Sequence, residues 1–275
     1  MKHLNVFLWL LSLGSASYMM ADVYTVEVGQ FEKLKVNGNI NVIYKNLPDS
    51  TGYARYRAPE GSADFFQFST KGEGNLKVEP ADDKWGANDL PVLCLYSDFL
   101  SSVESYSDGT VSVVSPAPCS TFSAKLVGNG TINIDGVKCN TITAAITTGN
   151  GSIYLSGSSV NANYRMVGAG LISADRLVAE NIKCRILGTG SIGCWPVDNL
   201  SVTGLGSTKI YYKGKPNIKK TGGGKLFELP EEMDEEAYSR LGTPVPSLNQ
   251  VEPADEEYDD EEYDDNTPTV VTDDD

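Results

Sequence analysis

Hydrophobic and polar residues alternate at every second position through the middle of the chain, and this alternation itself repeats about every twenty residues. The apolar positions fall into three registers: Phe122, Ile142, Ala162 and Ile182; then Ala124, Ala144, Tyr164 and Cys184; then Leu126, Ile146, Met166 and Ile186. A period of two is typical of β-strands, and a fixed longer period is typical of stacked repeats. The sequence therefore predicts an all-β fold, a β-solenoid whose coils stack roughly 4.8 Å apart with like residues above one another inside.

Each repeat is punctuated by two glycines that flank a single residue. The paired glycines are Gly128 and Gly130, Gly149 and Gly151, Gly168 and Gly170, and Gly188 and Gly190. Gly-X-Gly also occurs in phosphate-binding loops, but those loops lead into a helix whose N-terminus faces the phosphate. Because strand patterning follows every pair here, we interpret the glycines as structural corners, where the chain turns sharply and φ can be positive.

A less regular run of short strands precedes the repeats. The predicted strands are Tyr24–Val28, Leu34–Val36, Ile40–Tyr44, Ala54–Arg57, Phe65–Ser69, Leu76–Glu79, Val92–Tyr96 and Thr110–Val114. Turn residues such as Asn37-Gly38 and Pro48-Asp49 separate them. Because the open end of a solenoid core needs a cover, we expect these first coils to differ from the repeats.

The two ends of the chain differ from the part between them. Residues 1–21 follow the plan of a secretory signal peptide, with Lys2, an apolar run from Leu4 to Leu13 and small residues after it. At the other end, 19 of the 37 acidic residues lie between Glu228 and Asp275 against one basic residue there, so this tail carries 1 − 19 = −18 and the rest carries 21 − 18 = +3. We expect one domain at 22–229 and an acidic, disordered tail at 230–275, with a short helix at 231–241.

The predicted leader places the protein outside the cytoplasm, in the periplasm, at the outer surface or in the extracellular space. No other segment is apolar enough to cross a membrane, so we expect no transmembrane segment. An exported chain with a strongly acidic tail and no basic stripe is also not expected to bind nucleic acid.

Three features resemble the Bacteroidetes putative auto-transporter adhesin family, also called the head GIN domain family. They are the opening stretch FEKLKVNGNINV at 31–42, the repeated Gly-X-Gly turns, and the closing stretch GSTKIYYKGKP at 206–216. The similarity spans 28–225, although this chain has Asn, Ala, Thr or Leu in the middle of its Gly-X-Gly turns where the family commonly has serine. The resemblance implies a right-handed parallel β-helix and an extracellular or periplasmic location. It implies little about activity, because a fold does not determine a function.

Histidine-dependent chemistry is excluded for the exported protein, because the only histidine is His3 in the predicted signal peptide. Carboxylates are the remaining candidates. Asp135 and Asp175 each lie five residues after a corner glycine, two coils apart, which places their backbones about 9.6 Å from each other. This overlaps the separation of roughly 6.5–9.5 Å found in inverting glycosidases. Turn-facing aspartates are common in solenoids, however, so we assign no catalytic residue.

Five cysteines in an exported chain favour disulfides. Cys119 and Cys139 share a register on adjacent coils, and a Cα separation near 4.8 Å falls within the disulfide range, so this pair is the candidate bridge. Cys184 and Cys194 are predicted to face inward, either as free thiols or as a bridge, and Cys94 is left over. The cysteine spacing does not fit a metal site, and we assign no metal or cofactor.

The function predicted from these observations is that of a non-enzymatic adhesin, with flat stacked faces that bind a surface glycan or protein. Four aromatic residues are candidates for stacking on sugars: Tyr154, Trp195, Tyr211 and Tyr212. A carbohydrate-active enzyme and a structural component of the cell envelope are the alternatives. The sequence leaves open whether copies of the chain associate.

Overall fold

The computed structural model describes residues 21–59, 64–70, 72 and 74–230. The predicted signal peptide, acidic tail and short helix at 231–241 lie outside the described residues, except for Ala21 and Pro230 at their boundaries. Strands make up 68% of the described chain and there is almost no helix, so the predicted all-β solenoid is confirmed, with about 6 turns. Two short 3₁₀ turns, η1 (Pro48–Ser50) and η2 (Asp82–Lys84), interrupt the strands of the N-terminal part.

Short strands form the N-terminal part and longer ones the repeats. The short strands are β1 (Ala21–Glu27), β2 (Lys33–Asn37), β3 (Val42–Lys45), β4 (Tyr53–Pro59), β5 (Phe66–Thr70), β6 (Asn75–Pro80), β7 (Leu93–Tyr96), β8 (Ser102–Tyr106) and β9 (Thr110–Val114). The strands that follow are β10 (Cys119–Val127), β11 (Thr131–Thr148), β12 (Ser152–Gly168), β13 (Leu171–Gly188), β14 (Ser191–Leu205), β15 (Lys209–Tyr212), β16 (Asn217–Gly222) and β17 (Lys225–Glu228). All eight strands expected before the repeats are present, and β8 was not predicted.

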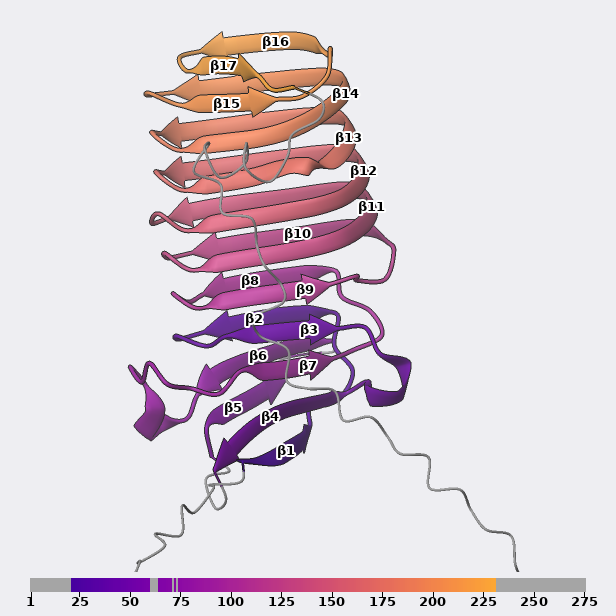
Figure 1. The fold of residues 1–275 in the computed structure, drawn as a ribbon, viewed down its shortest axis with the longest axis vertical. Helices are drawn as coiled ribbons and strands as arrows, with labels where there is room; N and C mark the ends of the chain where they lie inside the picture. Colours follow the sequence, from indigo (N-terminus) through magenta and orange to yellow (C-terminus); the bar gives the residue numbers. More distant parts are fainter. Residues whose placement is uncertain (1–20, 60–63, 71, 73, 231–275) are drawn as a thin grey trace, which may run out of the picture.

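Parallel strands stack into two faces, seen in Figure 1 as a ladder of arrows. The first face consists of β6, β2, β8, β10, the C-terminal halves of β11 to β14, and β16. The second face consists of β7, β3, β9, the N-terminal halves of β11 to β14, β15 and β17. Each of β11 to β14 is long because it runs along the second face, bends at a corner and continues on the first face of the next coil.

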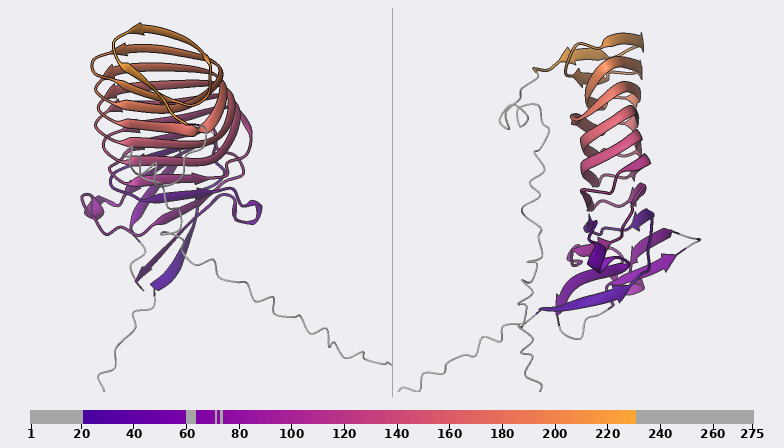
Figure 2. Two further views of the ribbon diagram at one scale, coloured as in Figure 1. Left: turned by 45° about the horizontal axis from the view of Figure 1, so that its top comes forward. Right: turned by 90° about the vertical axis from the view of Figure 1, so that its right-hand side faces the viewer.

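The coils are not stacked in the order of the sequence. Strand β2 pairs with both β6 and β8, and β3 pairs with both β7 and β9, so the β2–β3 coil lies between two coils that follow it in the chain (Figure 1). Antiparallel strands then cover the β6–β7 coil: β5 pairs with β6, β4 with β7, and β1 with β4. The side view in Figure 2 shows these strands projecting beyond the narrow column of coils. These antiparallel strands cover the open end of the solenoid core, as the sequence led us to expect.

The core consists of the registers read from the sequence. In the first register, Phe122 pairs with Ile142, Ile142 with Ala162, and Ala162 with Ile182, and all four are buried. The other two registers pair in the same way, through Ala144 and Tyr164 and through Ile146 and Met166. Burying side chains of this size stabilises the fold by roughly 1.5–3 kcal/mol for each large apolar residue.

The paired glycines lie at the corner where each coil passes from the first face to the second. Gly149, for example, has φ +89, and a Cβ there would overlap the carbonyl oxygen of Gly128 in the preceding coil. Both features require glycine, because other residues rarely adopt positive φ and because the coils approach each other through their backbones.

The residue between the paired glycines also has a structural role in the lower coils. The Asp108 Oδ1 atom accepts a hydrogen bond from the Asn129 backbone N–H at 3.1 Å, and the Asn129 Oδ1 atom accepts one from the Asn150 N–H at 3.2 Å. Asp108, Asn129 and Asn150 thus form a ladder of side chains along the corner. Asn129 at this position therefore satisfies the backbone N–H of the next turn.

Candidate functional site

The aromatic candidates lie mainly on the outer side of the second face. Register pairing puts five outward positions in one column across adjacent strands: Tyr154, Ser173, Gly193, Tyr211 and Phe227. The rings of Tyr211 and Phe227 are stacked, with centroids 5.2 Å apart. Alternation along the strands produces this column, because every second residue of a strand points away from the core.

Two small residues separate the aromatic rings of this column. Ser173 and Gly193 occupy the two strands between Tyr154 and Tyr211, so the two rings are three strand spacings apart, roughly 14 Å. Tyr154 is half-buried, and this burial raises the pKa of its hydroxyl. The rings of Tyr154 and Tyr211 thus flank a stretch of small side chains on the sheet.

Asp175 lies beside this stretch and is only 3% exposed. Its Oδ1 atom accepts a hydrogen bond from the Ser173 hydroxyl at 2.7 Å. The same oxygen lies 3.2 Å from the position that a Cβ of residue 193 would occupy, so Gly193 leaves room for the carboxylate. A buried carboxylate needs such partners, because desolvation without hydrogen bonds is costly.

Lys213 and Trp195 complete the cluster. Lys213 is 4% exposed, and its Nζ atom lies 5.0 Å from the centroid of the Trp195 ring, which is a cation–π distance. Burial lowers the pKa of Lys213, the nearby Asp175 carboxylate raises it, and Arg176 lowers it further. We call Tyr154, Ser173, Asp175, Gly193, Trp195, Tyr211, Lys213 and Phe227 the aromatic cluster.

The two candidate carboxylates differ in their surroundings. Asp135 lies two strands before Asp175, with Ser156 in the coil between them, and the Ser156 hydroxyl donates a hydrogen bond to Asp135 Oδ1. Asp135 is exposed, whereas Asp175 is buried and bonded to Ser173. Each carboxylate therefore has its own serine partner.

Tyr212 differs from the other aromatic candidates. It pairs with Cys194, which points into the core, and it packs against the core rather than facing outward. It therefore does not belong to the aromatic cluster. Sequence reasoning missed Ser173, Gly193 and Lys213, although counting along the repeat from Tyr154 to Tyr211 would have placed the first two in the intervening coils.

The cysteines are free thiols in the structure. Cys119 and Cys139 lie directly opposite each other on β10 and β11, as their spacing predicts, and burial raises the pKa of both thiols, that of Cys139 to about 11. Cys184 and Cys194 are both buried, and hydrogen bonding with Cys184, followed by burial, raises the pKa of Cys194. Their pairing into disulfides stays a prediction.

Among the residues that the structure describes, no three His, Cys, Asp or Glu side chains gather closely enough to hold a metal ion. The described part of the chain also contains no helix with the length and hydrophobicity needed to pass through a membrane.

Several solved structures are similar to this chain in fold. The crystal structure of a putative adhesin from Bacteroides fragilis has a TM-score of 0.64 and 20% identity, covering 76% of this chain and 97% of its own. A putative lipid binding protein from Parabacteroides distasonis has a TM-score of 0.60 and 18% identity, covering 76% and 96%. A putative adhesin from Parabacteroides merdae has a TM-score of 0.59 and 19% identity, with the same coverage. At these identities the similarity shows a shared fold.

No curated protein matches this chain. The model of one protein family, described as the putative auto-transporter adhesin, head GIN domain, matches residues 30–216. That match covers most of the solenoid, including the opening stretch at 31–42 and the closing stretch at 206–216. The chain belongs to the putative auto-transporter adhesin, head GIN domain family.

Proposed function

We propose that this protein is an exported, non-enzymatic adhesin that binds a surface glycan through its aromatic cluster. The observation that carries the proposal is the column in which Tyr154 and Tyr211 flank Ser173 and Gly193, with Trp195 alongside. Aromatic rings stack on the apolar faces of sugar rings, and buried polar groups beside them orient hydroxyls. The family and two of its structural neighbours, described as putative adhesins, support this function.

The polar part of the cluster supports binding rather than catalysis. Asp175 is held by Ser173 and lies near Lys213, so its charge is partly compensated. Asp135 is held by Ser156, and no histidine is present beyond residue 3. Each of the two carboxylates considered as a general acid and base is therefore engaged by a serine hydroxyl.

A glycan-array experiment on the full chain tests the proposal. We expect saturable binding without product, and a loss of affinity of at least about tenfold in the Trp195→Ala and Tyr211→Ala variants. The matched control is Tyr53→Ala, because Tyr53 is also an exposed aromatic residue on a strand but lies in the N-terminal part.

The same experiment separates the alternatives. Glycan cleavage that is lost in Asp175→Asn would establish the carbohydrate-active enzyme in place of the adhesin. Binding to lipid vesicles but not to glycans would favour the property named for the Parabacteroides distasonis neighbour. Absence of binding to any glycan, lipid or matrix protein would overturn the adhesin proposal and favour a structural role in the envelope.

A further inference from the structure

Four cationic side chains face outward on the upper part of the first face. They are Arg165 on β12, Lys183 and Arg185 on β13, and Lys219 on β16, and all four are exposed. The strands between β12 and β16 are adjacent, so the four charges lie within about 14 Å along the stack. We call these four residues the basic face.

The basic face lacks internal compensation. Arg165 and Arg185 lie directly opposite each other on neighbouring strands, an arrangement of like charges that destabilises a sheet. The other outward positions of these strand halves hold neutral residues: Asn163, Val167, Leu187, Ser201, Thr203, Leu205 and Thr221. Within the described residues, none of the four cations forms an ion pair.

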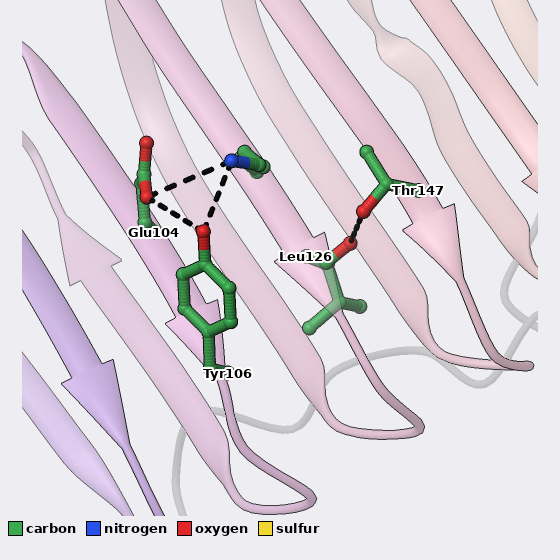
Figure 3. Close-up of polar contacts among 5 residues, drawn as sticks. Glu104, Tyr106, Leu126 and Thr147 are labelled. Carbon is green, nitrogen blue, oxygen red and sulfur yellow. Dashed lines mark hydrogen bonds and ion pairs between the residues drawn. The ribbon is translucent and has the colours of Figure 1, made fainter.

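In the lower part of the same face, two lysines form polar contacts with acidic side chains. There the Lys125 Nζ atom donates to the Tyr106 hydroxyl at 3.0 Å, and Tyr106 donates to Glu104 Oε2 at 3.2 Å (Figure 3). Lys125 also lies 3.8 Å from Glu104, and Lys77 pairs with Glu79 at 2.5 Å. Lys77 and Lys125 of the lower coils thus have acidic partners on the sheet, whereas the four cations of the basic face have none among the described residues.

Exposed aliphatic side chains border the basic face. Leu187 is 52% and Leu205 is 62% exposed, and they lie opposite each other on β13 and β14. Leu187 is two residues from Arg185 on the same side of the strand. An occupant of this surface therefore needs negative charges together with some apolar cover.

We propose that the occupant is the acidic segment 255–265 of the same chain. This segment reads DEEYDDEEYDD and carries nine carboxylates and two tyrosines, Tyr258 and Tyr263. Its charge complements the four cations, and its tyrosines supply apolar contact for Leu187 and Leu205. Fully extended it reaches roughly 37 Å, more than enough to follow the basic face along the stack.

The covalent link makes this partner available at high effective concentration. The Leu229 N–H donates to the Tyr212 carbonyl at 2.7 Å, so the chain leaves the solenoid from its C-terminal coils, the same end that carries Lys219. About 25 residues then precede Asp255, and a flexible linker of that length reaches roughly 25–30 Å. The two faces of a stacked sheet are only about 10 Å apart. Effective concentrations for such linkers are in the millimolar range.

When the acidic segment is bound, the basic face is not accessible to other polyanions. The segment neutralises the opposed Arg165 and Arg185 and covers Leu187 and Leu205, and it excludes other polyanions from this surface. The aromatic cluster lies on the second face, so this contact is independent of the proposed glycan binding.

Carbodiimide cross-linking of the full chain with peptide mass spectrometry tests the proposal. The reagent joins a carboxylate to a lysine amine with loss of water, so Lys183 and Lys219 should be joined to segment 255–265. At about 50 mM salt we expect these cross-links to be at least fivefold more abundant than those to Lys33 or Lys138, and to be lost at about 1 M salt. Lys33 and Lys138 are suitable references because both are exposed lysines elsewhere on the solenoid. A mixture of ¹⁴N and ¹⁵N protein identifies links between copies.

Variants provide a second measurement. Replacing the nine acids by their amides leaves the solenoid unchanged and should increase binding of dextran sulfate, a polyanionic probe, by about tenfold. Adding Lys183→Glu and Arg185→Glu should abolish that gain, whereas Lys33→Glu with Lys138→Glu should preserve most of it. Equal cross-linking to all lysines, cross-links only between copies, or unchanged probe binding in the amide variant would each overturn the proposal.

Discussion

The N-terminal part and the repeat part of this protein build the same stacked core by different means. The repeats, from β10 to β17, rely on glycine corners and on columns of like residues that place one backbone on the next. The N-terminal part relies more on contacts between individual side chains. The comparison shows that the interior of a solenoid is specified by repetition, whereas its end requires a unique solution.

Side-chain contacts in the N-terminal part are correspondingly specific. The Tyr56 ring packs edge-on against Phe66 at 5.1 Å and is stacked with Tyr24 at 5.5 Å. The Tyr44 hydroxyl donates to the Ser97 carbonyl at 2.7 Å, and burial raises the pKa of this hydroxyl far above its usual value. Aromatic pairs of this kind contribute about 0.5–1.5 kcal/mol beyond their burial.

The largest difference between the two parts should appear at glycines with similar backbone angles. Gly149 in the repeats has φ +89 and Gly86 in the N-terminal part has φ +85, but a Cβ at residue 86 meets nothing within 4 Å. We expect Gly149→Ala to lower the free energy of unfolding by about 3–5 kcal/mol, because backbone overlap with Gly128 adds to the strain of positive φ. Gly86→Ala should cost only the strain, about 1–2 kcal/mol. Urea denaturation followed by circular dichroism measures both.

An equal loss of stability in the two variants would contradict this account. It would mean that positive φ alone determines the cost and that close approach of the coils contributes little. Gly29→Ala serves as a second control, since Gly29 has φ +73 and open space around it.

The same division explains what the sequence could predict. The registers through Phe122, Ala124 and Leu126 could be predicted from the sequence because each inward position recurs in several coils. The placement of β2 and β3 between later coils was not readable, because only long-range pairing with β6 and β8 defines it. For the candidate site, Tyr154 and Tyr211 were found by residue type, whereas the burial of Asp175 and Lys213 depends on side-chain packing across coils.

Oxidation of the first repeats should have the next largest effect. Two glutathione equivalents are released when oxidised glutathione converts the Cys119 and Cys139 thiols to a disulfide, and the bridge closes a loop of about 20 residues. In the chain-entropy account this stabilises the protein by about 3 kcal/mol. Peptide mapping identifies the bridge, and the shift of the urea midpoint measures its effect. Recovery of both thiols unmodified after oxidation would refute the pairing, and the buried Cys184 and Cys194 serve as internal references.

The pH dependence of Cys139 reports its burial. Its pKa is raised from 9.0 to about 11, mainly by burial and then by the neighbouring Cys119. The folded state thus favours the protonated thiol, so this contribution to stability is complete below about pH 9 and is lost as the pH rises through about 11. Alkylation by iodoacetamide should accelerate up to about pH 11 in the folded protein, whereas a plateau near pH 9 would show that the thiol is not buried.

The two ends of the stack also differ in how they are protected from association, and we expect a smaller effect there. The N-terminal end is covered by antiparallel strands, whereas Lys220 on β16 pairs with buried Val202 and so occupies an inward position at the C-terminal end. Its Nζ atom donates to the Gly224 carbonyl at 2.6 Å. A charge at such a position prevents edge-to-edge pairing. We expect Lys220→Val to cause concentration-dependent association, measured by light scattering, whereas Lys219→Val on the outward side of β16 should leave the mass unchanged. A monomeric Lys220→Val protein would show that the end is protected by other means.

The smallest effect is expected along the corner ladder, where the lower and upper repeats differ. Asn129 accepts a hydrogen bond from the Asn150 N–H, whereas at the corner of Thr189 the corresponding N–H donates to the Gly168 carbonyl at 3.1 Å. Asn129→Ala removes an exposed acceptor, so we expect a loss of about 0.5–1 kcal/mol in urea denaturation. Thr189→Ala should change stability by less, because its backbone N–H already has a backbone partner. If both substitutions prove neutral, water replaces the Asn129 side chain without cost, and the corners are held by glycine geometry alone.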